Sequence, residues 1–254
     1  CSNLTQKLVE RGFKVTVLDN LSKQIHGENQ NSTLYSSIKD IVTFIQGDVC
    51  NKSDWKKALR NQDAVIHLAS ETGTGQSMYD ISRYNKVNIL GTTHLLDILA
   101  NENHSIKKMI IASSRSIYGE GKYLCKNDGV LYPNQRQDID MAKGKFNLVC
   151  NKCNEPLQLL ATDEDSKIHP SSIYGITKQQ QEQMILLIGK SLNIPAVALR
   201  YQNVYGPGQS LNNPYTGILS IFSTRLLNGN GIDIYEDGQE SRDFVFIDDV
   251  VSAT

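Results

Sequence analysis

Several features that mark common functional classes are missing from this sequence of 254 residues. No apolar run approaches the roughly 20 residues that a membrane-spanning helix needs, so we expect no membrane association. The formal net charge is −1 and no basic stripe alternates with aromatic residues, which argues against nucleic acid as a partner. The five cysteines are odd in number and too sparse for a disulfide scaffold, so we expect a cytoplasmic protein.

Both ends of the chain lack features that we expect of complete termini. The first residue is Cys1 rather than Met, and it adjoins an amphipathic stretch at residues 2–11. The last residues follow 248–251, a pattern that resembles the start of a helix. We therefore expect a chain truncated at both ends, in which the absence of a targeting signal carries little weight.

The sequence does contain an alternation of short apolar segments with helical patterns. The apolar segments are continuous and rich in Val and Ile, which is typical of strands buried on both faces of a parallel sheet. This alternation predicts a Rossmann-type, doubly wound α/β sheet, with ligands beyond the carboxyl ends of its strands. The expected strands are residues 13–19, 42–48, 64–69, 109–114, 196–201, 232–237 and 243–248, and the expected helices are 2–11, 53–60, 79–101 and 174–192.

Three regions depart from the alternation. Residues 24–39 are polar and predict a surface loop, and residues 119–169 form a longer insertion without a clear period. The last part of the chain is rich in Gly, Pro and Asn. We therefore predict a Rossmann-type domain over 1–201 that carries the insertion, followed over 202–254 by the start of a smaller α/β substrate-binding region.

Polar or small residues follow three successive predicted strands. A carboxylate at the first exit, Asp19, can accept hydrogen bonds from an adenosine ribose and repel a 2′-phosphate, which favours NAD over NADP. Taken alone, Asp19 fits an ordinary turn better, and the ordered succession of exits is what favours a dinucleotide site. The predicted cofactor residues at these exits are Asp19, Asn20, Asp48, Val49, Leu68 and Ala69.

No glycine-rich phosphate loop precedes these exits. In a dinucleotide fold that loop joins the first strand to the first helix and holds the pyrophosphate. Because the first predicted helix already begins near residue 2, we expect the chain to lack the first strand and its loop.

The spacing Tyr-x-x-x-Lys occurs three times, and only its surroundings distinguish the copies. A catalytic pair needs both side chains on one helix face, where the ammonium lowers the pKa of the phenol from about 10. The copy at 35–39 lies in the polar segment, and the copy at 118–122 spans two glycines that disfavour a helix. Tyr174 and Lys178 open an amphipathic helix and follow the strand that ends at Ser114, whose hydroxyl can serve a proton transfer or simply a turn.

A set of motifs occurs in a definite order along the chain: Leu-Asp-Asn-Leu, Gly-Asp-Val, His-Leu-Ala, Ser-Ser-x-x-Ile-Tyr-Gly, Tyr-x-x-x-Lys, Arg-Tyr-x-Asn-Val-Tyr-Gly-Pro and Arg-Asp-Phe-Val-x-Ile-Asp-Asp. In this order they resemble the extended short-chain dehydrogenase/reductase family, and within it the NAD-dependent sugar-nucleotide epimerases and dehydratases. The resemblance covers essentially the whole chain. It implies bound NAD, a nucleotide-sugar substrate and a homodimer.

The resemblance also implies roles for single residues. The family's catalytic positions correspond to Ser114, Tyr174 and Lys178, of which Tyr174 is the acid/base and Lys178 also holds the nicotinamide ribose. Asn203 and Arg242 match residues that contact the substrate diphosphate, although Arg242 alone would fit a surface ion pair better. Asn88 matches a family asparagine near the cofactor.

Departures from the family pattern narrow the reaction. The 4,6-dehydratases carry Thr-Asp-Glu where this chain has Ser114-Arg115-Ser116, so elimination lacks its acid and base. The resemblance therefore implies epimerisation at C4 through a transient 4-keto sugar, and residues 67–79 with the insertion look most like the dTDP-L-rhamnose 4-epimerases. Another epimerase, reductase or dehydratase of the family, or a non-catalytic NAD-binding protein, stays open.

The insertion contains three cysteines, Cys125, Cys150 and Cys153. Their spacing would suit a tetrahedral zinc site, with Asp128 or His169 as a fourth ligand. Unligated, partly buried cysteines are the alternative, and no thioredoxin-like pattern surrounds them.

Overall fold

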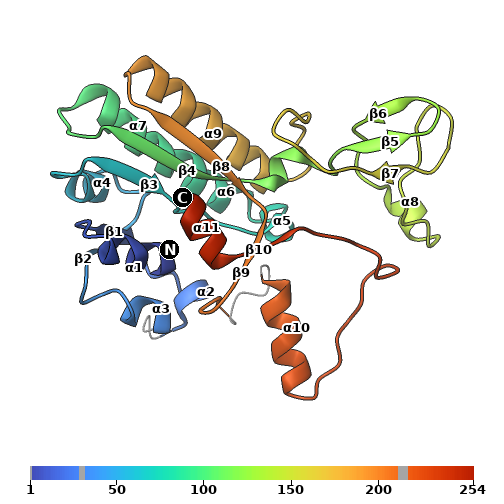
Figure 1. Ribbon diagram of the computed structural model, residues 1–254, viewed down its shortest axis with the longest axis horizontal. Coiled ribbons are helices and arrows are strands. Elements are labelled where there is room, and N and C mark those ends of the chain that lie inside the picture. Colours follow the sequence, from blue (N-terminus) through green and yellow to red (C-terminus); the bar gives the residue numbers. More distant parts are fainter. Residues whose placement is uncertain (1, 29–31, 211–216) are drawn as a thin grey trace.

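The structure, a computed structural model, describes residues 2–28, 32–210 and 217–254. Five parallel strands form the body of the molecule (Figure 1). β1 (Thr16–Asp19) pairs with β2 (Thr43–Gln46), while β4 (Lys108–Ser114) lies between β3 (Ala64–His67) and β8 (Ala196–Tyr201). Parallel strands joined through helices confirm the predicted α/β class.

The hydrogen-bonded ladder is interrupted between β1 and β3. The five strands form one sheet of two and one sheet of three, and no described strand joins them. In the doubly wound order the first strand of the fold lies between the second and the fourth. The sheet is therefore interrupted at that position among the described residues.

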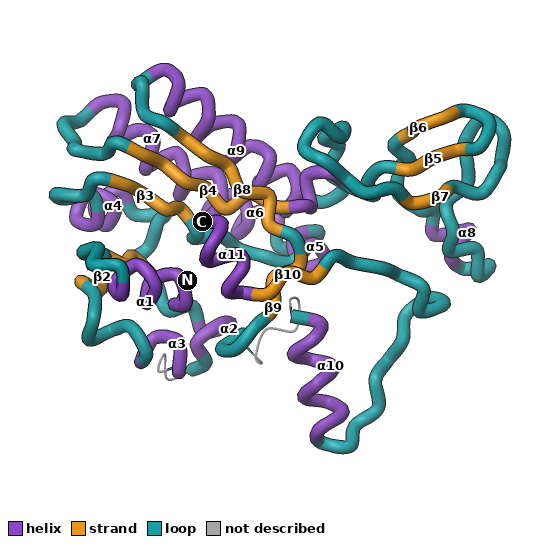
Figure 2. The backbone as a smooth tube through the Cα atoms, viewed as in Figure 1, coloured by secondary structure: helices purple, strands orange, loops and turns teal. Residues whose placement is uncertain are grey.

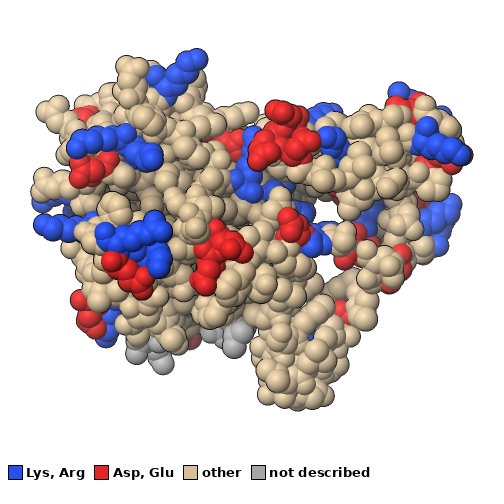
Figure 3. All heavy atoms as spheres, viewed as in Figure 1, with Lys and Arg blue, Asp and Glu red and all other residues tan. Residues whose placement is uncertain are grey.

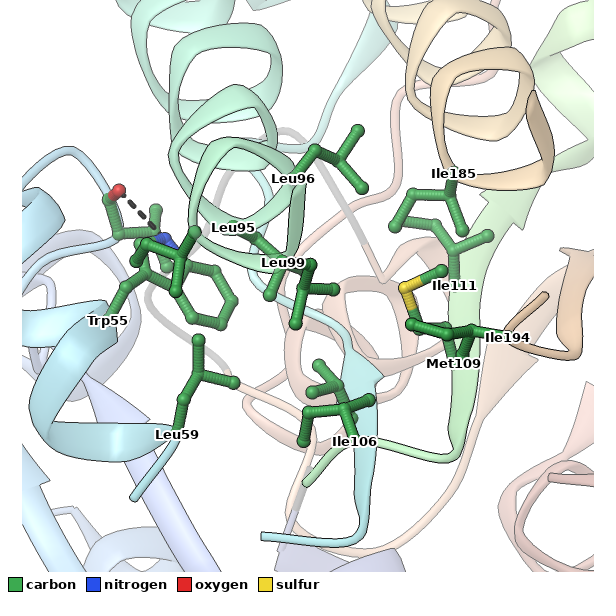
Figure 4. Close-up of a cluster of buried hydrophobic side chains, with 13 residues drawn as sticks. Trp55, Leu59, Leu95, Leu96, Leu99, Ile106, Met109, Ile111, Ile185 and Ile194 are labelled. Carbon is green, nitrogen blue, oxygen red and sulfur yellow. Dashed lines mark hydrogen bonds between the residues drawn. The ribbon is translucent and has the colours of Figure 1, made fainter. Parts of the chain in front are cut away.

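Helices cover the three-stranded sheet and bury its main core (Figure 4). α4 (Lys52–Ala58), α7 (Gly91–Asn101) and α9 (Ile173–Ser191) contribute Trp55, Leu95 and Ile185, which pack with Met109 and Ile111 of β4. The indole N–H of Trp55 donates to the carbonyl oxygens of residues 49 and 91, each at 3.0 Å. This core packs the first half of β4 against the second half of α9. α1 (Ser2–Glu10) agrees with its predicted bounds to one residue.

The helix predicted at 79–101 is divided into three parts. These are α6 (Ile81–Tyr84), the π-helical turn η1 (Asn85–Leu90) and α7. Asn88 lies in η1 and is buried, and its side-chain amide donates to the hydroxyl of Thr177 on α9 at 2.9 Å. The hydroxyl of Thr92 on α7 donates to the backbone carbonyl of Asn88 at 2.6 Å. π-helical turns lie mostly inside α-helices, frequently at functional sites. A prediction based on the 3.6-residue period of the α-helix does not reveal them.

Two loop predictions missed short elements. The polar segment 24–39 overlaps α2 (Lys23–His26) and includes α3 (Thr33–Ser36). The insertion forms an antiparallel sheet of β6 (Gly129–Leu131), β5 (Tyr123–Cys125) and β7 (Gln158–Leu159), with α8 (Asp138–Met141) below it. It extends away from the parallel sheet and consists mostly of loop (Figure 2).

The last part of the chain differs most from prediction. The strand expected at 232–237 is wrong, because Ile234 and Tyr235 are 73% and 83% exposed and pair with no described strand. The strand expected at 243–248 is β10 (Phe244–Phe246), parallel to β9 (Asn203–Tyr205) and followed by α11 (Ile247–Ala253). α10 (Ile218–Leu227) was not predicted. Among the described residues no helix has the length and apolar character needed to cross a membrane.

Candidate active site

Ser114 and Tyr174 meet at the carboxyl end of β4. Ser114 ends that strand and its hydroxyl accepts the N–H of Ser116 at 3.2 Å, capping the 3-10 turn η2 (Arg115–Tyr118). Ser172 caps α9 in the same way by accepting the N–H of Gly175 at 3.1 Å. The two caps place the hydroxyl of Ser114 close enough to Tyr174 to lower the pKa of that phenol.

Lys178 lies one helical turn beyond Tyr174 and is 2% exposed. Burial lowers its pKa to about 7, against a smaller opposing effect of Glu182. Its ammonium donates to the side chain of Gln181 at 2.8 Å. Two of its three N–H donors are thus left to other partners.

The pKa of Tyr174 differs from the expectation. We expected Lys178 to lower it, whereas burial raises it above the ordinary value and the hydrogen bond with Ser114 opposes that rise. The physical reason is that a phenolate loses hydration in this partly buried position, while the Lys178 ammonium is engaged with Gln181. Ser114, rather than Lys178, is the contact that favours ionisation in this state.

One large cavity connects the predicted catalytic and substrate residues. Its volume is about 1380 Å³, and it opens between the ends of β4 and β8 and the segment 217–254. The predicted residues that line it are Leu68, Ser114, Tyr174, Lys178, Asn203 and Arg242. Residues from five separate stretches of the sequence are thus gathered at the strand ends, as a doubly wound sheet requires.

A second cavity of about 630 Å³ lies at the exits of β1 and β2. Asn20 and Asp48 line it. The Asp19 carboxylate accepts the N–H of Leu21 at 2.8 Å within the turn that follows β1. Val49 and Ala69 belong to the packing of the main core. The cofactor residues predicted at the strand exits are therefore divided between cavity wall, turn and core.

Asn88 uses its side chain entirely within the protein. Its oxygen accepts the N–H of Glu71 at 2.8 Å and the hydroxyl of Ser70 at 3.1 Å. Its amide donates to Thr177 on α9. Asn88 therefore fixes the loop after β3 to the helix that carries Tyr174.

Arg115 and Arg136 line the larger cavity together with Arg242, but the sequence did not single them out as substrate-binding residues. Arg136, from the insertion, pairs with Glu236 and with Glu240 at 2.9 Å, and Glu240 also pairs with Arg242. Burial, and then the charge of Arg242, lower the pKa of Arg115, so the two guanidinium groups act on each other. The clustering of cations was not visible because these arginines are far apart in sequence.

The Tyr-x-x-x-Lys copy at 118–122 has a structural role. The hydroxyl of Tyr118 accepts a hydrogen bond from Arg200, which also binds the buried carboxylate of Glu182 at 2.7 Å. Lys122 pairs with Asp163 at 2.7 Å. Arg200 and Glu182 thus tie β8, α9 and η2 together beneath the site, a network that sequence spacing did not indicate.

This arrangement defines the class of protein: a doubly wound α/β protein with a large cavity at its strand ends. The family profile described as "NAD dependent epimerase/dehydratase family" matches residues 1–155 and 149–254. The chain therefore belongs to that family.

Individual relatives are similar over nearly the whole chain. The dTDP-L-rhamnose 4-epimerase of Burkholderia thailandensis is 36% identical, over 98% of this chain and 67% of its own length. The UDP-glucose 4-epimerase of Thermotoga maritima, solved with UDP-glucose, superposes with a TM-score of 0.71 at 27% identity, over 99% of this chain and 67% of that one. The UDP-glucuronic acid 4-epimerase of Bacillus cereus, solved with UDP-glucuronic acid and NAD, gives 0.73 at 26% identity, over 98% and 67%.

Proposed function

We propose that this protein epimerises a nucleotide-activated sugar at C4, with dTDP-L-rhamnose as the first substrate to test. The observation that carries the proposal is the single cavity shared by Ser114, Tyr174 and Lys178 with Asn203 and Arg242. The Burkholderia relative supports the choice of substrate, because it is named dTDP-L-rhamnose 4-epimerase at 36% identity.

Tyr174 is proposed as the acid and base of the reaction. As the phenolate, whose formation Ser114 favours, Tyr174 removes the proton of the sugar C4 hydroxyl, and it later returns that proton to the 4-keto oxygen. The sugar turns over between the two steps, so the new C4–H bond forms on the opposite face. Bound NAD would supply the hydride acceptor and donor for C4, so that there would be no net oxidation.

The described residues fit the two ends of a dinucleotide. Asn20 and Asp48 line the smaller cavity and are proposed to meet adenosine, with Asp19 at the ribose. Lys178 lines the larger cavity with donors to spare and is proposed to hold the nicotinamide ribose. The sequence contains no glycine-rich loop for the pyrophosphate between them.

The substrate diphosphate is proposed to lie near Asn203, Arg115 and Arg242. Arg115 is half-buried in the cavity wall and forms an ion pair with no carboxylate among the described residues. A half-buried guanidinium without such a partner is stabilised by a bound anion. Arg115 and Ser116 also occupy the two positions at which the 4,6-dehydratases carry the carboxyl groups that elimination needs. This difference supports epimerisation over dehydration.

A homodimer is proposed through the helices on one side of the sheet. α7 and α9 lie side by side there (Figure 1) and contact each other. Ile176 and Leu187 of α9 are 40% and 67% exposed. Exposed apolar residues on neighbouring helices are typical of surfaces that a second copy covers.

The test is Tyr174→Phe in the full-length protein, with dTDP-L-rhamnose as substrate. The expected result is a loss of turnover of about 10²-fold or more with NAD still bound, because phenylalanine keeps the ring and removes the proton carrier. Tyr35→Phe, outside the cavity, is the matched control and should keep full activity. Near-normal turnover by Tyr174→Phe would contradict the assignment.

The same assay distinguishes the alternatives. A 4-epimerase converts one isomer into another without added reductant and without net NADH. The other activities need other substrates: a reductase consumes NADH with a 4-keto sugar, and a dehydratase acts on a nucleotide sugar that still carries its C6 hydroxyl and gives a 4-keto-6-deoxy product. A protein that binds NAD but turns over no nucleotide sugar would be a non-catalytic binding protein.

A further inference from the structure

The insertion at 119–169 has almost no apolar core of its own. All of its residues are described, and four are buried: Gly121, Cys125, Cys150 and Ser166. Apolar residues on its strands and loops point to solvent instead, with Val130, Val149 and Leu159 each about half exposed. Its strands are two or three residues long. A unit of this size without a core needs another source of stability, such as a disulfide or a metal.

The most buried side chains of the insertion are two of its cysteines. Cys125 and Cys150 are 1% and 0% exposed, and they meet Asp128 and Cys153 in one cluster. The four ligand atoms all lie within 4.8 Å of one another. The cluster draws on β5, on the β5–β6 turn and on the loop before β7, so it joins segments that share few other contacts.

Distances within the cluster match a tetrahedral zinc site. A Zn–S bond of about 2.3 Å and a Zn–O bond of about 2.0 Å place two sulfurs about 3.8 Å apart and a sulfur and an oxygen about 3.5 Å apart. Sγ of Cys125 and Sγ of Cys153 are 3.5 Å apart. Asp128 Oδ2 lies 3.6 Å from Sγ of Cys125 and 3.1 Å from Sγ of Cys150.

The backbone presents the four ligands in two similar turns. Each turn has the spacing ligand-x-x-ligand and is followed by a residue in the left-handed region: Gly129 at φ 76° after Asp128, and Asn154 at φ 60° after Cys153. In the second turn the N–H of Lys152 donates to Sγ of Cys150 at 3.5 Å. N–H groups directed at a sulfur favour its thiolate form, which is the form that binds metal.

We propose that Cys125, Asp128, Cys150 and Cys153 bind one structural Zn²⁺. Four protein ligands leave no open position, so the site holds the insertion together and takes no part in chemistry. Binding converts three thiols to thiolates and releases three protons, which gives a site with a net charge of −2. Lys152 Nζ lies 3.9 Å from Asp128 Oδ1, and more Lys or Arg side chains are visible at the outer end of the insertion (Figure 3).

Asp128, and not His169, is the fourth ligand of the proposed site. His169 lies at the base of the insertion, where its N–H donates to the carbonyl of Ile117 at 2.9 Å and its ring packs against Tyr132. It belongs to no metal-ligand cluster among the described residues. The site is also independent of the proposed epimerase activity, so the metal content and the turnover can fail separately.

The test measures metal in the full-length protein, purified with reductant and without chelator. The expected result is one zinc per chain, lost in Cys150→Ser and Cys153→Ser and retained in the matched control Cys50→Ser. Because a cysteine variant that fails to fold would also lose metal, Co²⁺ is added to the unaltered, metal-stripped protein. A tetrahedral thiolate absorption at one equivalent of Co²⁺, displaced by Zn²⁺, supports the site.

Two results overturn the proposal. One is less than 0.1 zinc per chain together with no thiolate absorption on adding Co²⁺ to the reduced protein. The other is a Cys125–Cys153 disulfide in protein purified without reductant that no excess of Zn²⁺ prevents. Two variants test Asp128 as the fourth ligand. Asp128→Cys supplies a fourth thiolate and should keep the zinc, whereas Asp128→Ala should weaken zinc binding at least tenfold.

Discussion

At the scale of single residues, the side chain of Lys178 is buried away from water. Burial lowers its pKa from 10.5 to about 7. The unfolded chain therefore binds more protons than the folded chain between about pH 7 and pH 10.5, and the contribution of Lys178 to the free energy of unfolding rises with pH across that window. The full effect is roughly 5 kcal/mol at most.

This predicts a pH-dependent effect of Lys178→Met. The variant should be more stable than the unaltered protein at pH 6.5, and its advantage should shrink steadily toward pH 9.5. Urea unfolding at each pH measures the difference, with Lys190→Met on the exposed side of the same helix as the control. A difference that does not change with pH would show that Lys178 is not buried as a charge.

The sequence predicted which residues line one cavity better than it predicted their pKa values. Ser114, Tyr174 and Lys178 followed from strand order and helix context, and they line one cavity. The direction of the Tyr174 pKa shift was wrong, because burial and the engagement of Lys178 with Gln181 depend on packing that spacing does not encode. Family roles carried over to Asn203 and Arg242 stay predictions.

At the scale of elements, the contact between α9 and η2 sets the distance between Tyr174 and Ser114. Gly175 follows Tyr174, and a Cβ atom there would lie 2.6 Å from the carbonyl oxygen of Ser116 and 2.9 Å from Pro170 Cβ. A backbone oxygen gives way only if the whole turn shifts. The glycine is thus required by the close approach of two backbones.

Gly175→Ala should therefore separate the catalytic pair. We expect kcat to fall about 10- to 100-fold, because small displacements of reacting groups cost that much, and the unfolding free energy to fall by about 1–3 kcal/mol. Gly75→Ala is the control, since Gly75 is also helical and a Cβ there meets no atom within 4 Å. Equal kcat for the two variants would contradict the proposed geometry.

The strands were predicted more accurately than the irregular elements. β8 (Ala196–Tyr201) has its predicted bounds, because its continuous apolar residues are typical of a strand in a parallel sheet, although Val197 is 44% exposed. The π-helical turn, the sheet of the insertion and α10 were missed. Their conformations depend on Asn88 contacts, on the cysteine cluster and on neighbours distant in sequence, none of which produces a local period.

At the scale of the whole molecule, the exposed apolar face of α9 supports the homodimer. Leu187→Glu should place a charge in the interface and convert the dimer to a monomer, which sedimentation velocity measures. Leu227→Glu, at an 88% exposed position on α10, should leave the dimer intact. A monomer before any substitution, or a dimer that withstands Leu187→Glu, would contradict the proposed surface.

At the scale of the fold, the two parallel sheets and the insertion contribute residues to the two cavities in which the reaction is proposed to occur. The sheet is interrupted between β1 and β3, and the insertion reaches the larger cavity through Arg136. The proposed reaction is a transient oxidation of the sugar at C4. It requires the hydrogen at C4 to leave and return within one site.

That requirement is tested by dTDP-L-rhamnose labelled with deuterium at C4, incubated with the full-length protein in ordinary water. Hydride that passes to NAD and back never exchanges with solvent, so the account predicts an epimerised product that keeps its deuterium at C4. Mass spectrometry and proton NMR of the product measure the label. Epimerised product with hydrogen from water at C4 would contradict the account.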